Sequence, residues 1–385
     1  MSHAAPFRLF VNPRRGIPGM VVLPASGYRR ARAEIMSWPG YAPTPLVPLP
    51  GVAASLGLAA VSVKDEAPRF GLGSFKALGG AYAVLGAVSG ALARHGDAAG
   101  ATAAALEAGE YAEAAARVTV CCATKGNHGL SVAWGAQRFG AACHVFVRET
   151  VSQVRVDAIA RHGAVIHRVP GTYDDAVQAA AAAAREEGWI VVSDTSWPGY
   201  TEIPREVMQG YRLMADEALD QWVGAAPTHV FIQAGLGGVA AAVSVQMRAR
   251  LDPPPALVVV EPDEAAYLLA SAEVEGLNKV EGELDTIMAG LACGIPSLLG
   301  WQELERGAAA FMAIPDTAAV DAMRVLAGVG VMAGESGAAG LGALMRAAQD
   351  GAARTALGLE AGSRVLLFST ERATDPALYK ALISA

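Results

Sequence analysis

The chain has 385 residues and a mass of 39.4 kDa, which is enough for roughly two or three domains. Hydrophobic residues make up 53% of it and charged residues only 17%, which excludes a disordered chain because disorder requires low hydrophobicity and high charge. The net charge of −7, without a dense cluster of Lys and Arg, argues against a nucleic-acid partner.

Two uncharged stretches, residues 77–93 and 224–247, raise the question of a membrane span. The second is long enough to cross a bilayer, but it contains Pro227 and several glycines. It is better interpreted as a strand, a glycine loop and a helix, so we expect no membrane partner.

The four cysteines predict reduced thiols, because Cys121, Cys122, Cys143 and Cys293 form no C-x-x-C pair and no zinc-ligand spacing. Residues 1–9 lack the basic region and apolar stretch of a secretory signal. We therefore expect a cytoplasmic protein without a metal site.

Helices and strands alternate along the chain after residue 98. Residues 98–116 are rich in Ala, with Glu107, Glu110 and Glu113 spaced three apart, and predict a helix with one solvated face. The apolar runs that follow predict strands at 118–122, 144–147, 165–169, 189–193, 229–233, 257–261 and 364–369. The segments between the earlier strands predict helices at 128–139, 152–162 and 173–187. This alternation is typical of βαβ units and parallel sheets.

We therefore expect an α/β fold with two domains. The smaller one would comprise residues 77–194, and the larger one residues 1–76 and 195–385. Ligands of open parallel sheets bind beyond the carboxyl ends of the strands. That rule selects four loops for inspection: 124–129, 194–200, 234–239 and 369–374.

The glycine-rich segment 233–240 (QAGLGGVA) follows a predicted strand and opens a helix. Glycines and free helix amides suit a phosphate, although the segment has neither Walker-loop nor G-x-G-x-x-G spacing. A tight turn that binds no ligand is an equal alternative.

Lys76 stands among apolar and small residues, and the acidic residue closest to it in sequence is Glu66. Burial of such a lysine disfavours the ammonium form, and a neutral amine can form a Schiff base. A surface lysine at the start of a helix is the alternative.

The third candidate loop is segment 123–129 (ATKGNHG). Its Asn and Gly residues permit unusual backbone angles, so its amides could wrap a carboxylate. A helix start capped by Asn127 is the alternative.

Together the three loops resemble those of fold type II pyridoxal-phosphate (PLP) enzymes, the group of the tryptophan synthase β-subunit and threonine dehydratase. Within that group the chain is most similar to the diaminopropionate ammonia-lyase family, in order along residues 68–375. The segments that carry the resemblance are 69–82 (RFGLGSFKALGGAY), 126–134 (GNHGLSVAW), 194–204 (DTSWPGYTEIP), 208–211 (MQGY), 233–235 (QAG), 286–294 (TIMAGLACG), 334–338 (GESGA) and 369–371 (STE). The resemblance implies two open parallel-sheet, three-layer domains with the active site between them, PLP as cofactor and a homodimer.

By this resemblance, Lys76 would hold PLP as a Schiff base, and Asp194 would take the α-proton of an L-amino acid. Asn127 would bond the ring hydroxyl, and Ser369 or Thr370 would face the pyridine nitrogen. The phosphate would bind to Gly235, Leu236, Gly237, Gly238 and Val239. Substrate contacts would come from Ser74, Thr124, Lys125, Gly126, His128 and Tyr173, of which His128 is more readily interpreted as a structural histidine.

The implied reaction is α,β-elimination. The α-proton is removed, the group on the β-carbon leaves, and hydrolysis yields a 2-oxo acid and ammonia; diaminopropionate would give pyruvate and two ammonia molecules. Two alternatives stay open: a dehydratase of serine, threonine or 3-hydroxyaspartate, and a non-catalytic paralogue that binds PLP.

Two residues depart from the family pattern. Lys125 stands where the family has an Asp that serves as the base for the D-substrate, so we expect loss of D-isomer activity. An ammonium there would repel the distal amine of diaminopropionate and attract an anionic group, which predicts a different substrate. Lys125 could therefore recognise a carboxylate, or act as a base if its pKa is lowered. Arg372 replaces a Gly and would alter the wall near the pyridine ring.

Overall fold

The structure, a computed structural model, describes residues 7–98, 100–279, 284–293 and 296–384. Residues 1–6 of the N-terminal segment, Ala99 of the predicted Ala-rich helix, and Gly294 of segment 286–294 lie outside the described residues. The chain divides into two compact units. Unit 1 comprises Met1–Leu23, Pro43–Ser74 and Arg212–Ala385, and unit 2 comprises Pro24–Ala42 and Phe75–Tyr211.

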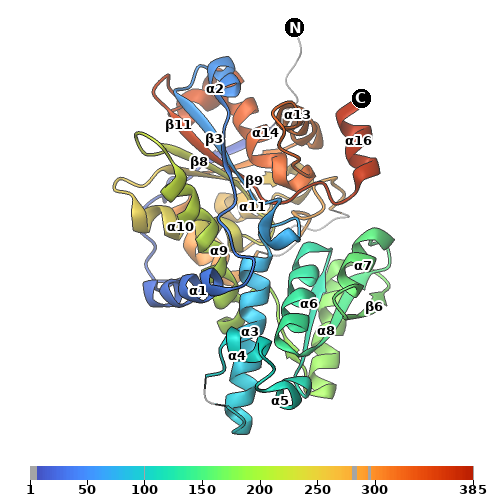
Figure 1. Cartoon of the computed structure of the whole chain (residues 1–385). Coiled ribbons are helices and arrows are strands. Elements are labelled where there is room, and N and C mark those ends of the chain that lie inside the picture. Colours follow the sequence, from blue (N-terminus) through green and yellow to red (C-terminus); the bar gives the residue numbers. More distant parts are fainter. Residues whose placement is uncertain (1–6, 99, 280–283, 294–295, 385) are drawn as a thin grey trace. The chain divides into compact units, whose positions relative to one another are not determined.

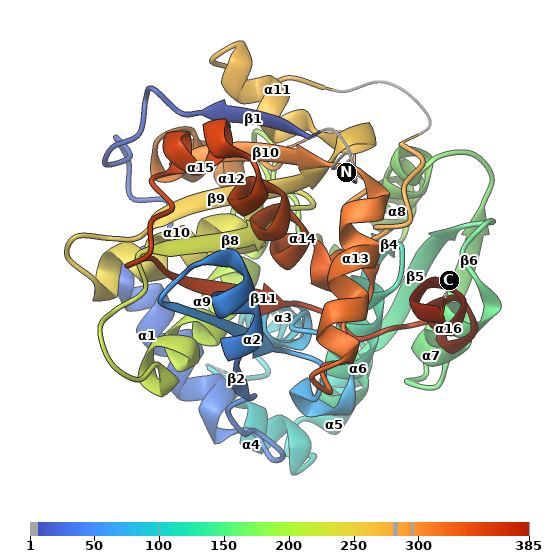
Figure 2. The ribbon, with the colours of Figure 1, turned by 90° about the horizontal axis from the view of Figure 1, so that it is seen from above.

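Unit 1 is built on a sheet that has seven strands among the described residues, in the order β1-β10-β9-β8-β11-β3-β2. Figure 2 shows β1, β10, β9, β8 and β11 side by side in this order. The inner strands are parallel, and the edge strands β1 and β2 are antiparallel to their neighbours. The strands are β1 (Arg8–Val11), β2 (Leu46–Pro48), β3 (Ala60–Asp65), β8 (His229–Gln233), β9 (Ala256–Pro262), β10 (Ala310–Ile314) and β11 (Arg364–Ser369).

Helices cover this sheet, and α14 packs against β8, β9, β10 and β11 while α10 packs against β8 and α12. Alternate strand residues such as Phe231, Val258 and Leu367 belong to one buried cluster with α13 and α14. Strands buried on both faces are continuous apolar runs, which is why the sequence predicted β8, β9 and β11. The helices are α2 (Pro50–Leu56), η1 (Arg69–Gly71), α10 (Gly238–Arg250), η2 (Asp263–Ala265), α11 (Tyr267–Glu273), α12 (Leu298–Gly307), α13 (Asp316–Ala327), α14 (Glu335–Gln349), α15 (Gly351–Leu357) and α16 (Pro376–Ser384).

Unit 2 is built on a parallel four-stranded sheet of order β6-β5-β4-β7. Helix α3 packs on α6, and α8 packs on β4 and β5 (Figure 1). Its elements are α1 (Ala25–Ser37), α3 (Ala77–His95), α4 (Ala103–Glu107), α5 (Ala112–Ala116), β4 (Thr119–Thr124), α6 (Asn127–Phe139), β5 (Ala142–Arg148), α7 (Gln153–Ala160), β6 (Val165–Val169), α8 (Tyr173–Glu187), β7 (Ile190–Val191) and the first part of α9 (Glu202–Gln221). Helix α3 is long and apolar enough to cross a membrane, but it is mostly buried and serves as a core helix of this unit.

The predicted parallel α/β fold is confirmed, and the strands predicted at 165–169, 229–233 and 364–369 have the expected bounds. The expected helix at 98–116 is wrong in one respect: the segment forms two short helices, α4 and α5. Gly109 lies between them with φ at 77°, in the left-handed region, so the first helix ends before it.

The two units also differ from the domain limits expected at residues 77 and 194, because residues 24–42 and 195–211 belong to unit 2. The Trp38 ring packs edge-on against Trp134 and Phe139. Gly210 in α9 lies so close to α3 that a Cβ there would be 1.9 Å from the carbonyl oxygen of Leu78. These contacts join segments that are distant in sequence, so composition alone did not place the limits.

Candidate active site

Lys76, immediately before α3 in unit 2, forms a partly buried ion pair. Its Nζ lies 2.5 Å from Oδ2 of Asp194, with side-chain exposures of 23% and 8%. The same nitrogen lies 5.1 Å from the ring centroid of Phe75 and 5.5 Å from that of Tyr211, within cation–π range. The amine is thus held by one carboxylate and two aromatic faces.

The pKa of Lys76 is shifted upwards, whereas burial alone would lower it. Burial lowers the pKa of Lys76, but the charge of Asp194 outweighs it, and the net pKa is raised. Burial raises the pKa of Asp194, but His128 and Lys76 outweigh burial and lower it to about 2. The resting pair is therefore ammonium and carboxylate. The sequence-based expectation of a neutral amine is wrong for this state because Asp194, 118 residues away, was not considered as its partner.

Asp194 follows β7 in a loop that Tyr200 holds in place. The hydroxyl of Tyr200 donates to the carbonyl oxygen of Val191 at 2.7 Å and accepts from the backbone N–H of Ser193 at 3.1 Å. The Trp197 and Tyr200 rings stack within the same turn. The aromatic residues of segment 194–204 therefore fix the backbone that carries the carboxylate.

The β4–α6 loop reaches the same ion pair through His128. His128 is buried, its Nε2 donates to the carbonyl oxygen of Val192 at 2.8 Å, and its Nδ1 lies 3.7 Å from Oδ2 of Asp194. Burial lowers the pKa of His128, and the charge of Asp194 opposes this shift without reversing it. This anchoring accords with the structural interpretation of His128.

Thr124 shapes the start of this loop. Its Oγ1 accepts from the backbone N–H groups of Gly126 and Gly129, both at 3.0 Å. Gly126, with φ at 151°, is the residue before α6, so the alternative in which Asn127 caps the helix is wrong. Lys125 projects its Nζ over the ring of Tyr173 at 5.2 Å.

The glycine turn of unit 1 lies between the end of β8 and the start of α10 at Gly238. Gly237 has φ at 90°, and a Cβ on Gly235 would lie 2.9 Å from the carbonyl oxygen of Gly290. Only glycine fits this close approach without a shift. The first-turn amides of α10 have no partners within the helix and favour an anion.

The hydroxyls at the end of β11 differ in their partners. Gln233 Nε2 donates to Oγ1 of Thr370 at 2.8 Å and to the carbonyl oxygen of Phe368 at 2.9 Å. Ser369 Oγ is buried and has no hydrogen-bond partner in the described part of the chain. Ser74, also in unit 1, is buried and forms an isolated bridge with Glu371.

Arg372, which replaces a Gly of the family pattern, contacts Gly73 within unit 1. The backbone N–H of Arg372 donates to the carbonyl oxygen of Gly73 at 2.8 Å. A Cβ on Gly73 would lie 2.6 Å from Nε of Arg372, so this side chain covers Gly73. Arg372 therefore packs against the segment that leads to Lys76.

Comparison with known proteins identifies the family of this chain. A family model described as pyridoxal-phosphate dependent enzyme matches residues 37–371. The diaminopropionate ammonia-lyase of Escherichia coli K12 is 38% identical over 359 residues, covering 89% of this chain and 88% of that protein. The same enzyme of Salmonella typhimurium is 38% identical over 362 residues, covering 90% and 89%. The crystal structure of the holo Escherichia coli enzyme superposes with a TM-score of 0.89 at 35% identity, covering 98% of this chain and 96% of that one.

The chain belongs to the diaminopropionate ammonia-lyase family. It is a PLP-dependent enzyme of fold type II with the α,β-elimination chemistry of that family. Its residues fit the cofactor, because unit 2 holds a partly buried amine in a carboxylate pair, and unit 1 holds a glycine turn and a buried hydroxyl without a partner.

Two residues near the site were not predicted from the sequence as site residues. Tyr211 is buried, and its ring centroid lies 5.5 Å from Nζ of Lys76. Tyr211 ends segment 208–211 (MQGY), one of the segments that carry the family resemblance, and that membership was the sequence signal that could have found it. Arg155 lies beside Gly126, where its Cδ would be 3.4 Å from a Cβ on that glycine. No sequence signal separated it from an ordinary helix residue.

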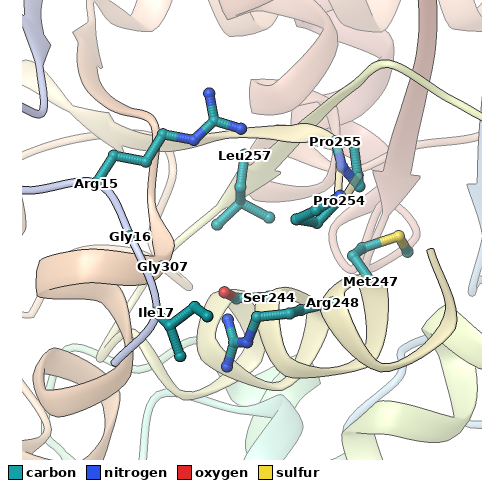
Figure 3. A pocket seen from close by; sticks show the side chains of 10 residues that line it. All are labelled: Arg15, Gly16, Ile17, Ser244, Met247, Arg248, Pro254, Pro255, Leu257 and Gly307. Atoms are coloured by element: carbon teal, nitrogen blue, oxygen red, sulfur yellow. The ribbon is translucent and has the colours of Figure 1, made fainter. Parts of the chain in front are cut away.

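Unit 1 also contains a cavity of about 190 Å³ that none of the predicted site residues line (Figure 3). Arg15, Met247, Arg248 and Leu257 contribute to its walls. Arg248 donates to both carboxylate oxygens of Glu303, so its charge is already balanced.

Proposed function

We propose that this chain is a cytoplasmic, homodimeric PLP-dependent lyase that removes the α-proton and the β-substituent of an L-amino acid, giving a 2-oxo acid and ammonia. The observation that carries the proposal is the 2.5 Å pair between Lys76 and Asp194, which supports the roles of Lys76 as the amine that would hold the cofactor and of Asp194 as the base. The four free, buried cysteines support a reducing compartment.

PLP supplies an aldehyde that condenses with an amine and a ring that accepts electrons from the α-carbon. Lys76 would hold it through Nζ, and the turn from Gly235 to Val239 would hold its phosphate. Ser369 would donate to the pyridine nitrogen, because its hydroxyl has no other partner among the described residues while Thr370 is engaged by Gln233. Asn127 would bond the ring hydroxyl.

Asp194 is a weak base while it is paired with Lys76, since its pKa is about 2. Substrate binding would displace Lys76 from the cofactor as a neutral amine, and Asp194 would then face no ammonium. Burial, the largest influence on this carboxylate, would raise its pKa and make it a stronger base. Asp194 would take the α-proton and pass a proton to Lys76, which would carry it to the leaving group.

The β4–α6 loop would hold the α-carboxylate of the substrate. Thr124 fixes the loop through the amides of Gly126 and Gly129, and the first turn of α6 directs N–H groups outward.

An amino-acid panel tests the proposal. The holoenzyme is assayed for 2-oxo acid and ammonia with β-chloro-L-alanine, L-serine, L-threonine, L-2,3-diaminopropionate and L-threo-3-hydroxyaspartate. Release of both products in equal amounts from a β-substituted L-amino acid, or in a 1:2 ratio from diaminopropionate, supports the lyase. Turnover of the hydroxy amino acids alone identifies a dehydratase. A covalent PLP adduct without turnover of any compound identifies a non-catalytic paralogue and refutes the proposal. The elution mass in solution tests the homodimer.

A further inference from the structure

We infer that the cavity in unit 1 is a binding site for a small carboxylate with an apolar body, and that its occupation makes the ligand an effector of the enzyme. All of the residues that line the cavity belong to unit 1, and none of them has a role in the proposed function. Binding itself does not depend on the proposed function, whereas the effect on the cofactor rests on the glycine turn holding the PLP phosphate.

Apolar side chains form much of the wall of this cavity. Its volume is about 190 Å³, whereas pockets for drug-sized molecules have roughly 300–1,000 Å³. A cavity of about 150 Å³ is enough to bind benzene in another protein. Met247 and Leu257 are buried in the wall, and Ile17 and Pro254 contribute further apolar surface. The volume and the wall therefore fit a branched hydrocarbon group of a few carbon atoms.

Arg15 brings a positive charge to the cavity. Its guanidinium has no ion pair and no side-chain hydrogen bond among the residues that the structure describes. Figure 3 shows the Arg15 side chain across the cavity from Ser244 and Arg248. Arg248 donates to both carboxylate oxygens of Glu303, at 2.8 and 3.0 Å, and no described residue that lines the cavity is Asp or Glu. Arg15 is therefore left to pair with an anionic group of a ligand.

The loop that carries Arg15 is fixed on the end of α12. Asn12 Nδ2 donates to the carbonyl oxygen of Ala308 at 2.8 Å. The backbone N–H of Gly16 donates to the carbonyl oxygen of Arg306, also at 2.8 Å. The backbone is thus held by hydrogen bonds on both sides of Arg15, so only the side chain loses freedom when a carboxylate binds.

The cavity and the glycine turn share two helices, α10 and α12, which pack against each other. α10 begins at Gly238, directly after the turn, and Met247 near its other end lines the cavity. α12 contacts the turn near its start, where a Cβ on Gly300 would lie 3.1 Å from the carbonyl carbon of Gly237, and its last residue, Gly307, lines the cavity. A ligand in the cavity would contact both helices and stabilise the packed arrangement that forms the turn.

The methyl group of Met247 reports binding at the cavity itself. The holoenzyme, labelled with carbon-13 at its methionine methyl groups, is titrated with isovalerate, and the Met247 signal is assigned from Met247→Leu. The signal should shift and saturate. By this signal, the Kd of isovalerate should be at least about 10-fold lower than that of isovaleramide, the neutral isostere, because a charge-assisted hydrogen bond is lost. It should also be lower than that of inorganic phosphate, which lacks the apolar body.

Two exposed residues of the cavity allow substitutions that keep the fold, Arg15 and Ile17. Arg15→Ala should raise the Kd of isovalerate about 10- to 100-fold and leave that of isovaleramide unchanged. Ile17→Glu would add a carboxylate that competes for Arg15, so it should remove isovalerate binding. The control is Arg185→Ala, at an exposed arginine of α8 in unit 2, which should change neither Kd.

The effect on the cofactor is measured separately. The Kd of PLP for the PLP-free protein is determined with and without saturating isovalerate. Isovalerate should lower the Kd of PLP about 5-fold or more, which is the low end of coupling between two sites. This change should disappear in Arg15→Ala, which separates it from any binding of isovalerate elsewhere on the protein.

The outcomes distinguish failure of the inference from failure of the proposed function. An unshifted Met247 signal, or equal Kd values for isovalerate and isovaleramide, would overturn the binding site. A saturable shift with an unchanged Kd of PLP would overturn the effector role. Absence of a reducible adduct at Lys76 would overturn the proposed function and would leave the Met247 shift in place.

Discussion

The ammonium of Lys76 donates to the carboxylate of Asp194 across 118 residues of sequence, with Lys76 half-buried and Asp194 buried. Each group holds the other in its charged form, so the Asp194 carboxylate is a weak proton acceptor while Lys76 is an ammonium. The pair thereby links the protonation of Lys76 to the basicity of Asp194. Two predictions concern its members directly.

Lys76→Ala should abolish covalent cofactor attachment. After incubation with PLP and reduction with borohydride, mass spectrometry should find the adduct on the wild-type protein and not on the variant. Circular dichroism should show that the fold is retained, because the substitution shortens a side chain ahead of α3 without entering the helix. An adduct that persists at full yield would remove Lys76 from its role, and Lys380→Ala serves as the matched lysine control.

Asp194→Asn should leave the cofactor bound and slow the reaction. The amide cannot accept the α-proton, so kcat should fall about 10²–10⁴-fold, the typical contribution of a positioned base. Steady-state rates and the absorbance of bound PLP measure the two effects separately. An unchanged kcat with L-amino acids would reject the assignment, and Asp157→Asn on the exposed side of α7 is the matched control.

The stability of the PLP-free protein should depend on pH through Asp194. Its pKa is lowered from 3.8 to about 2 on folding, so the carboxylate stabilises the fold above pH 3.8 and loses this contribution as pH falls towards 2. The raised pKa of Lys76 affects stability at alkaline pH. The contribution of the Lys76 ammonium to the free energy of unfolding is complete below pH 10.5 and declines at higher pH. Urea unfolding should show that the gap in free energy between wild type and Asp194→Asn narrows as pH falls from about 4 to about 2. A gap that stays constant over this range would contradict the ion pair.

Arg69 should be essential for stability rather than for chemistry. It is 1% exposed and bonds both carboxylate oxygens of Glu66 (2.8 and 2.8 Å) and of Glu217 (2.8 and 2.7 Å). Arg69→Met would leave two buried carboxylates without this partner, at a cost of about 3–5 kcal/mol in the free energy of unfolding. Urea denaturation measures the loss, with Arg161→Met on an exposed residue as the control. A loss below about 1 kcal/mol, the value of a surface pair, would contradict the buried network.

The enzyme should act on L-amino acids and not on their D-isomers. In the proposed function Asp194 would take the α-proton from one face of the α-carbon, and the other loop position, Lys125, offers no carboxylate to act as a base. Rates of 2-oxo acid release from β-chloro-L-alanine and β-chloro-D-alanine measure the selectivity. Equal rates for the two isomers would show that another group accepts the proton on the opposite face.

The alternation of apolar runs with helical segments predicted the parallel sheets, because a strand buried on both faces must be apolar along its whole length. Four strands of unit 1, β1, β2, β3 and β10, were not predicted. β1 and β2 are short edge strands that pair antiparallel and are only partly buried. β3 carries polar residues among its apolar ones, whereas β10 is a fully buried apolar run that the sequence analysis overlooked. The expected long helix at 98–116 failed because Gly109 takes a left-handed conformation that the Ala-rich composition concealed.

By itself, the sequence determined the α/β class, the three loops and the identity of the amine at position 76, since each depends on residues that are close in the chain. Only the tertiary structure decided that Asp194 is the partner of Lys76, that Tyr211 and Phe75 lie beside its amine and that Arg155 stands beside Gly126. The physical reason is that a charge responds to what surrounds it in space: burial alone predicted a neutral lysine, and one carboxylate brought from a distant loop reversed the direction of its pKa.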